Sequence, residues 1–188
     1  MNRFIRFIEG NIQGKKVFWL FSLTTLVYVF MLMVTIPKTM AFANGMKLLD
    51  MMPLGYDFNY VNDLFSSLGV QGRNTYLTIQ IPVDMVYPFL FGLTYSLLLG
   101  FFLNKIHQLK RPLIYLCALP VIAGLADYLE NFGVIVLLNT YPDLTAIEVH
   151  LTMIFSMLKS ATSAVYFTVL IMVLLWFGIQ SLFKAKKD

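Results

Sequence analysis

Four apolar runs, separated by shorter polar segments, dominate the pattern of this chain. A helix needs about 20 residues, at 1.5 Å each, to cross the ~30 Å hydrocarbon core of a bilayer. The pattern therefore predicts an all-α, polytopic membrane protein built as a four-transmembrane-helix bundle. We place the helices at residues 17–36, 81–104, 112–138 and 147–182, within a single integral membrane domain that covers residues 1–188.

Residues 1–16 precede the first span. Their apolar residues recur at helical spacing beside Arg3, Arg6, Lys15 and Lys16. This pattern is typical of a short interfacial helix whose cations lie near anionic lipid, and a frayed tail is the alternative. A cleavable signal peptide is disfavoured, because the apolar run that follows exceeds the roughly 7 to 15 residues of a signal sequence.

Residues 37–74 form the longest segment between spans, and they combine turn-forming residues with aromatic and aliphatic ones. Flexible linkers lack such apolar residues, so we expect a partly ordered cap loop packed on the helix ends. The alternative is that its apolar residues dip into the bilayer surface. A short helix is predicted from Asn59 or Tyr60 to Ser67, with Gly69 as its stop.

Two prolines leave the start of the second span open. Pro82 fits the first turn of a helix that begins near residue 81. If the helix begins at Asn74 instead, Pro82 and Pro88 are interior kinks, which membrane helices tolerate when neighbours satisfy the freed carbonyls.

The distribution of charge predicts the orientation. Cations gather before the first span, between the second and third, and after the fourth, so all three groups share one side. By the positive-inside rule both termini are cytoplasmic, and the loop 37–74 faces the periplasm, lumen or exterior. The net charge of +4 therefore indicates membrane orientation, and no nucleic-acid partner is expected. The three groups are Arg3, Arg6, Lys15 and Lys16; Lys105, Lys110 and Arg111; and Lys184, Lys186 and Lys187.

Composition excludes several kinds of chemistry. The chain is 59% hydrophobic and 13% charged, about half the ~25% charge of a soluble domain. Its single cysteine, Cys117, rules out an intrachain disulfide, dithiol chemistry and a thiolate metal cluster. The chain has no glycine-rich phosphate loop, HExxH motif or nucleophile elbow. We predict no metal site and assign no cofactor.

The segment AGLADYLENFG, residues 123–133, is the strongest polar anomaly in an apolar span. At about 100° per residue, Asp127, Glu130 and Asn131 lie on one helix face. An ionisable residue at membrane depth costs at least ~2.5 to 3.5 kcal/mol, so this face is predicted to meet protein or water and not lipid.

The fourth span carries a matching polar stripe that includes Lys159. Lys159 and Asp127 lie about 12 and 11 residues from the same end of their spans, which puts them at the same depth and predicts an ion pair. Asp127, Glu130 and Lys159 are the candidate catalytic residues. The candidate ligand-binding residues around them are Asn131, Asp84, Tyr87, Tyr95, Ser156, Ser163 and Tyr166.

The excess of acids over bases favours a functional site. We expect an aromatic cavity that opens outward and binds a small hydrophobic or cationic ligand, or acts on it by acid/base chemistry. Whether the protein is an enzyme is left open; double-bond isomerisation of a lipid-like molecule is one reaction that fits. Two alternatives remain. One is a proton- or cation-coupled transporter or channel subunit that forms an oligomer, and the other is an accessory subunit of a membrane complex with a purely structural polar cluster.

The layout of four spans, cytoplasmic termini and a long non-cytoplasmic first loop is similar to that of vitamin K epoxide reductases and of the EXPERA group of sterol isomerase-like proteins. The first family works through cysteine pairs, which this chain lacks. With the second it shares intramembrane acids in an aromatic setting, but no motif of that group aligns onto these positions. The resemblance is therefore one of topology.

Overall fold

The computed structural model describes residues 3–185, and this part of the chain is helical, without a strand. Within it, four helices are long and apolar enough to cross a membrane: Gly14–Met40, Phe58–Lys105, Leu113–Thr140 and Ala146–Phe183. The predicted all-helical class with four apolar helices is confirmed. Two cations used to predict the orientation, Lys186 and Lys187, lie outside the described residues.

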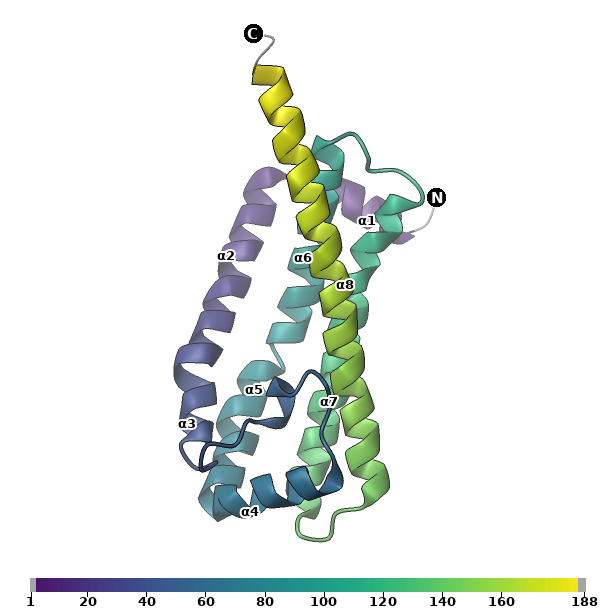
Figure 1. Cartoon of the computed structure of the whole chain (residues 1–188). Helices are drawn as coiled ribbons and strands as arrows, with labels where there is room; N and C mark the ends of the chain where they lie inside the picture. The colour runs from purple at the N-terminus through teal and green to yellow at the C-terminus, as the bar shows by residue number, and fades with distance from the viewer. Residues whose placement is uncertain (1–2, 186–188) are drawn as a thin grey trace.

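The four long helices run side by side along the molecule (Figure 1). Helix α2 (Gly14–Phe30) packs on α6 (Tyr87–Lys105), α6 packs on α7 (Leu119–Thr140), and α7 packs on α8 (Ala146–Ala185). Both termini lie at one end of the bundle, and α4 (Phe58–Thr75) lies across the opposite end. About half of the second and third spans is buried, but only a small share of the first and fourth. The second and third spans are therefore the core of the bundle.

Helix α1 (Arg3–Asn11) precedes the bundle and packs against α6. Its apolar side chains Ile5 and Ile8 are buried. A Cβ atom added at Gly100 of α6 would lie 2.7 Å from Cγ2 of Ile8, so the glycine makes room for this helix. Within this amphipathic segment, residues 3–11 thus form a docked helix and not a frayed tail.

Two of the long helices contain a π-helical turn. In the first span, η1 (Met31–Thr35) separates α2 from α3 (Ile36–Met40). In the second span, η3 (Tyr76–Gln80) lies before α5 (Ile81–Asp84). The two π turns contact each other, so the irregular parts of both spans lie at the same level of the bundle.

An Ile-Pro pair follows each π turn, with Pro37 and Pro82 as the second residue. Proline has no backbone N–H and its ring clashes with the carbonyl four residues back, which explains why the preceding turn is widened. The hydroxyl of Thr35 donates a hydrogen bond of 2.5 Å to Oε1 of Gln80, and both residues are buried. This bond links the two π turns.

The second span contains both of its prolines as interior residues. The helix runs on from α4 through η3 and α5, breaks into a turn at Met85 and Val86, and continues as α6 with Pro88 in its first turn. The alternative with two interior kinks therefore describes the chain better than a helix that begins at residue 81. Asp84, the last residue of α5 before this turn, is buried in the interior.

The segment predicted as a loop over residues 37–74 is more helical than expected. Only residues 41–57 link α3 to α4, and they include a short 3-10 turn, η2 (Leu49–Met51). Leu48 and Leu49 are fully buried, so this linking segment is anchored in the bundle. In Figure 1 it runs from α3 up between the helices and back down to α4.

Local signals explain the ends of α4. The side chain of Asp57 accepts a hydrogen bond of 2.8 Å from the backbone N–H of Tyr60, which caps the first turn. Gly69 interrupts the helix with φ of 59°, a backbone region that favours glycine. The predicted stop at Gly69 is thus a kink, because the helix resumes after it.

The third and fourth spans also have defined starts. A 3-10 turn, η4 (Leu113–Ala118), leads into α7. Helix α8 begins with a reciprocal pair: the N–H of Glu148 donates to Oγ1 of Thr145 at 3.3 Å, and the N–H of Thr145 donates to Oε2 of Glu148 at 3.1 Å. Such a capping box satisfies two backbone donors that a helix start leaves unpaired.

Helices α6 and α7 approach each other closely at two glycines. A Cβ atom added at Gly124 would lie 2.7 Å from the carbonyl oxygen of Pro88, and one added at Gly92 would lie 3.4 Å from that of Pro120. Backbone atoms cannot rotate away as a side chain can. The distance between the two core helices therefore depends on the missing side chain of Gly124.

We predict that Gly124→Ala destabilises the protein by about 1–3 kcal/mol, because the added methyl group forces the two core helices apart. The matched control is Gly178→Ala in α8, where an added Cβ has nothing within 4 Å. Alanine there favours the helix by up to about 1 kcal/mol. Thermal unfolding of the purified protein in detergent measures both, and equal Tm values for the two variants would contradict the assigned contact.

Candidate functional site

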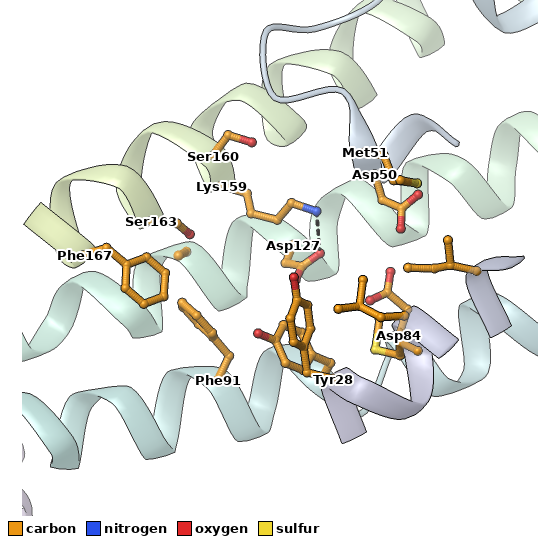
Figure 2. A pocket seen from close by; sticks show the side chains of 15 residues that line it. Tyr28, Asp50, Met51, Asp84, Phe91, Asp127, Lys159, Ser160, Ser163 and Phe167 are labelled. Atoms are coloured by element: carbon orange, nitrogen blue, oxygen red, sulfur yellow. Dashed lines mark hydrogen bonds and ion pairs between the residues drawn. The ribbon is translucent and has the colours of Figure 1, made fainter. Parts of the chain in front are cut away.

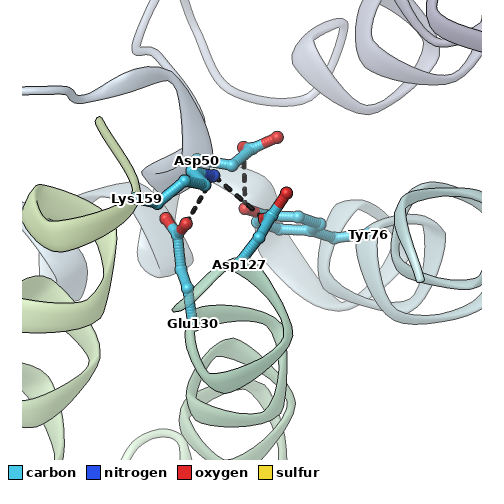
Figure 3. A network of polar contacts seen from close by, with 5 residues as sticks. All are labelled: Asp50, Tyr76, Asp127, Glu130 and Lys159. Carbon is cyan, nitrogen blue, oxygen red and sulfur yellow. Dashed lines mark hydrogen bonds and ion pairs between the residues drawn. The ribbon is translucent and has the colours of Figure 1, made fainter. Parts of the chain in front are cut away.

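Lys159 of α8 lies between two carboxylates of α7 (Figure 3). Its Nζ atom is 3.1 Å from Oδ1 of Asp127, to which it donates a hydrogen bond, and 2.5 Å from Oε2 of Glu130. The contact with Glu130 is an ion pair without hydrogen-bond geometry. Residues three apart on a helix share a face, which is why one lysine reaches both acids. The ion pair expected between Asp127 and Lys159 is present.

Glu130 is the most enclosed member of this trio. Its side chain has 0% exposure, against 18% for Lys159. Both carboxylate oxygens lack a hydrogen-bond partner among the described residues. Buried polar atoms without a partner are uncommon in folded proteins. Glu130 therefore depends on Lys159 for nearly all of its stabilisation.

Further unpartnered polar groups lie next to the trio in sequence. Asn131 of α7 and Ser156 of α8 are both buried, and neither the amide of Asn131 nor the hydroxyl of Ser156 has a partner within the described part of the chain. Neither residue lines the cavity described below. The polar interior thus extends beyond the ion pairs toward the interface of α7 and α8.

Asp50 reaches the same region from the linking segment and not from a helix. Its Oδ1 atom accepts a hydrogen bond of 3.2 Å from the hydroxyl of Tyr76. Burial raises the pKa of Asp50 from its usual 3.8, while the positive charge of Lys159 lowers it and the negative charge of Glu130 raises it. Figure 3 shows this side chain beside the lysine.

Asp84 contributes the fourth carboxyl group. It is 4% exposed, although it ends a short helix. Figure 2 shows the carboxyl groups of Asp84 and Asp50 pointing toward each other, and both residues line one cavity. Asp84 is therefore an interior residue, not a surface charge that complements a helix end.

Tyr56 lies at the edge of this group. Its ring is 8% exposed and its hydroxyl has no hydrogen-bond partner among the residues described. Burial, and then the negative charge of Glu130, raise the pKa of Tyr56 well above its usual value of 10.0. The hydroxyl is thus held in its neutral, hydrogen-donating form near the carboxyl groups.

A cavity of about 420 Å³ adjoins the charged residues. Small-molecule sites commonly have volumes of roughly 300–1,000 Å³. Lys159 and three of the acids line it, and Figure 2 shows Phe91 and Phe167 at the end away from Asp50. The two phenylalanines thus lie away from Asp50, whereas Tyr28 lies between Phe91 and Asp84. Its acids are Asp50, Asp84 and Asp127, and its aromatic residues are Tyr28, Tyr87, Phe91 and Phe167.

The aromatic residues form a connected set. The rings of Tyr28 and Tyr87 are stacked with centroids 5.4 Å apart. Tyr87 contacts Phe91 at 5.8 Å, and Phe91 contacts Phe167 at 6.2 Å. These rings come from α2, α6 and α8, so three helices share the aromatic lining of the cavity.

The predicted ligand-binding residues divide into two groups. Asp84, Tyr87 and Ser163 line the cavity with Asp127 and Lys159. Tyr95 and Tyr166 do not line it. The hydroxyl of Tyr166 donates a hydrogen bond of 2.8 Å to the backbone carbonyl of Tyr95, which ties α8 to α6.

Sequence reasoning missed Asp50, because this residue lies in the predicted loop 37–74 and not in one of the predicted helices. The two leucines before it were the available signal, since an apolar pair in a loop indicates burial. Tyr28 and Phe167 were also missed: on helices with long apolar faces, no pattern separates a ring that faces a cavity from one that faces lipid.

The site offers charge and hydrogen bonding, not an evident metal centre. Among the described residues, no three His, Cys, Asp or Glu side chains are grouped closely enough to hold a metal ion. What the site can do is hold a positive charge against several carboxylates and exchange protons with it. No family model, curated protein or solved structure matches this chain.

We predict that Lys159→Met destabilises the protein by about 3–5 kcal/mol, because two enclosed acids lose their counter-charge. Adding Asp127→Asn and Glu130→Gln to that variant is expected to recover most of the loss, since the two acids in contact with Lys159 are then neutral. Tm values of the purified variants measure both effects.

Lys47→Met is the matched control, because Lys47 is exposed and forms no ion pair in the described structure. It should leave Tm unchanged. A triple variant as unstable as Lys159→Met would show that the lysine stabilises the bundle through its packing rather than through its charge.

Proposed function

We propose that this protein binds a small organic molecule that carries a positive charge, within a cavity inside the membrane. The observation that carries the proposal is an imbalance of charge in and beside one cavity: three carboxyl groups line it together with a single lysine, and a fourth pairs with that lysine. The acids are Asp50, Asp84, Asp127 and Glu130, and the lysine is Lys159.

The imbalance favours a cationic ligand for a simple electrostatic reason. Lys159 compensates one negative charge, and the remaining acids must be protonated, meet water or bind a cation. A bound cation is stabilised by every carboxylate that stays ionised near it. An anionic ligand would have to overcome all of them, so this class is disfavoured.

The aromatic residues of the cavity support the same class of ligand. Cations, and quaternary ammonium groups in particular, are attracted to the faces of aromatic rings. Tyr28, Tyr87, Phe91 and Phe167 offer such faces within one cavity with the acids. Carboxylates and aromatic rings in one cavity suit an ammonium group that bears alkyl substituents.

A binding pocket is favoured over a transport pathway by the core next to α1. There the interior between α6 and α8 is filled by apolar side chains, including Leu97, Leu99 and Leu103. A path for ions or protons would need polar groups to continue through this region. The cavity is thus better suited to hold a ligand than to pass one through.

We infer that the helices span a membrane with both termini in the cytoplasm, as the distribution of basic residues predicts. The test uses single cysteines in a Cys117→Ala background, at Lys47 near α4 and at Lys110 near the opposite end. In intact cells a membrane-impermeant maleimide should label the cysteine at 47 and reach that at 110 only after lysis. The reverse pattern would overturn the orientation.

The binding proposal predicts that choline raises the Tm of the purified protein in a maltoside detergent, because a ligand that binds only the folded state stabilises it. The neutral isostere 3,3-dimethylbutan-1-ol should not. Stabilisation by both compounds alike would contradict recognition of charge.

Asp84→Asn is expected to weaken choline binding roughly tenfold to a hundredfold, as befits the loss of a charged contact of ~1.5–3 kcal/mol. The control is Asp143→Asn, an exposed acid in the loop before α8, which should bind choline as the wild type does. Unchanged binding in the Asp84 variant would sink the proposed site.

The affinity for choline should depend on pH in a way that reflects the ionisation of Asp50. A cation binds the ionised carboxyl better, and the raised pKa of Asp50 means that its charge is lost at a higher pH than that of an ordinary acid at 3.8. The ratio of wild-type to Asp50→Asn affinity should therefore be largest at pH 8 and fall toward one as the pH drops. The other three acids, Asp84, Asp127 and Glu130, are present in both proteins, so the ratio reports on Asp50.

A further inference from the structure

The bundle is open along one side. Helix α2 packs on α6, and α8 packs on α7, but over their described residues α2 and α8 have scarcely any direct contact. The row of helices thus ends in two edges that face each other without closing. The charged cavity lies between those edges, because Tyr28 and Leu32 of the first span and Ser163 and Phe167 of the fourth span all line it.

The side chains at this opening are exposed and apolar. Tyr28 and Leu32 are each 44% exposed, and Phe167 is 38% exposed. Deeper in the same cavity, Asp84 is 4% exposed. Polarity thus rises from the open side inward, as a site for an amphipathic molecule requires.

The two other directions are obstructed. Toward α4, the linking segment crosses the bundle with Leu48 and Leu49 fully buried. Toward α1, Tyr166 is fully buried and hydrogen-bonded to α6, and the core beyond it is apolar. The sequence suggested an outward opening, but the lining residues favour a lateral one.

We propose that the ligand enters sideways from the lipid bilayer, through a portal between the first and fourth spans, and is an amphiphile with a cationic head and an aliphatic tail. This rests on the proposed function, because it takes the carboxyl groups as the site of the head. The head lies between the acids and the aromatic rings. The tail extends past Leu32 and Phe167 into the hydrocarbon.

The surroundings of the portal fit such a tail. On both sides of it, the outer faces of α2 and α8 expose long rows of aliphatic and aromatic side chains. In a bilayer these faces meet lipid chains, so a tail that leaves the cavity remains in an apolar medium. A ligand without a tail would leave the opening to lipid and gain nothing from the apolar rim.

The test uses protein in nanodiscs of phosphatidylglycerol, which has no choline head, with radiolabelled decyltrimethylammonium as the probe and empty nanodiscs as the blank. Leu32→Trp places a large side chain in the portal and should slow association of the probe roughly tenfold. Met33→Trp is the matched control: the neighbouring residue is 74% exposed and does not line the cavity, so its rate should match the wild type.

Phe167→Ala gives a second variant on the opposite edge of the portal, and it should speed association. The Tm of each variant without ligand verifies folding. Choline binding in detergent should be unchanged in Met33→Trp, because residue 33 does not line the cavity.

The outcomes separate the two proposals. If the wild type binds choline and the probe, but Leu32→Trp and Phe167→Ala associate at the wild-type rate, the portal is wrong and the cationic site stands. Equal slowing by Leu32→Trp and Met33→Trp also overturns the portal. If the wild type binds neither compound, the proposed function fails and the portal with it.

Discussion

Placing charge where water is scarce is the constraint on which this structure depends. Lys159 meets that constraint by lying between Asp127 and Glu130, and its position fixes how α7 and α8 face each other. If the helices slid or rotated, these contacts would break and leave unpaired ions in a medium of low dielectric constant. The free-energy cost of such ions opposes the movement. The same contacts leave acids in excess, so the feature that fixes the register also gives the interior its negative character.

Irregular helices lie beside the cavity that the acids line. Straight helices packed on all sides would have filled the interior with side chains. Here the two π turns, each followed by an Ile-Pro pair, meet at one level and are joined by the bond between Thr35 and Gln80. Asp84, just before the break at residues 85 and 86, is buried. Residues from both irregular regions line the cavity: Met31 and Leu32 of η1, and Asp84 beside the break.

Much of this arrangement follows from the sequence. Apolar runs identify the four helices, because the thickness of a bilayer and the rise per residue of a helix together fix how many apolar residues a spanning helix needs. Helical projection and depth are enough to bring Asp127 and Lys159 together. Pairing of residues across helices at one depth is thus predictable, since the helix face and the depth of each residue can both be counted along the chain.

What the sequence does not show depends on long-range packing. Asp50 lies in a segment without periodicity, so no projection gives its direction, and only the buried leucines before it bring it inside. The exclusion of Tyr95 and Tyr166 from the cavity has a similar cause. Both tyrosines share a helix face with residues that line the cavity. They lie about one helical turn further along, where the same face contacts a neighbouring helix instead of the cavity.

The origin of Asp50 in a connecting segment has a consequence for the order of assembly. Helices that span a bilayer can insert and associate before the segments between them settle. The lysine and three of the acids are carried by helices, so they come together when the helices pack. The fourth acid arrives only when residues 41–57 fold back between them. The set of four acids is thus complete only when this linking segment is in place, so packing of the long helices alone does not make the finished site.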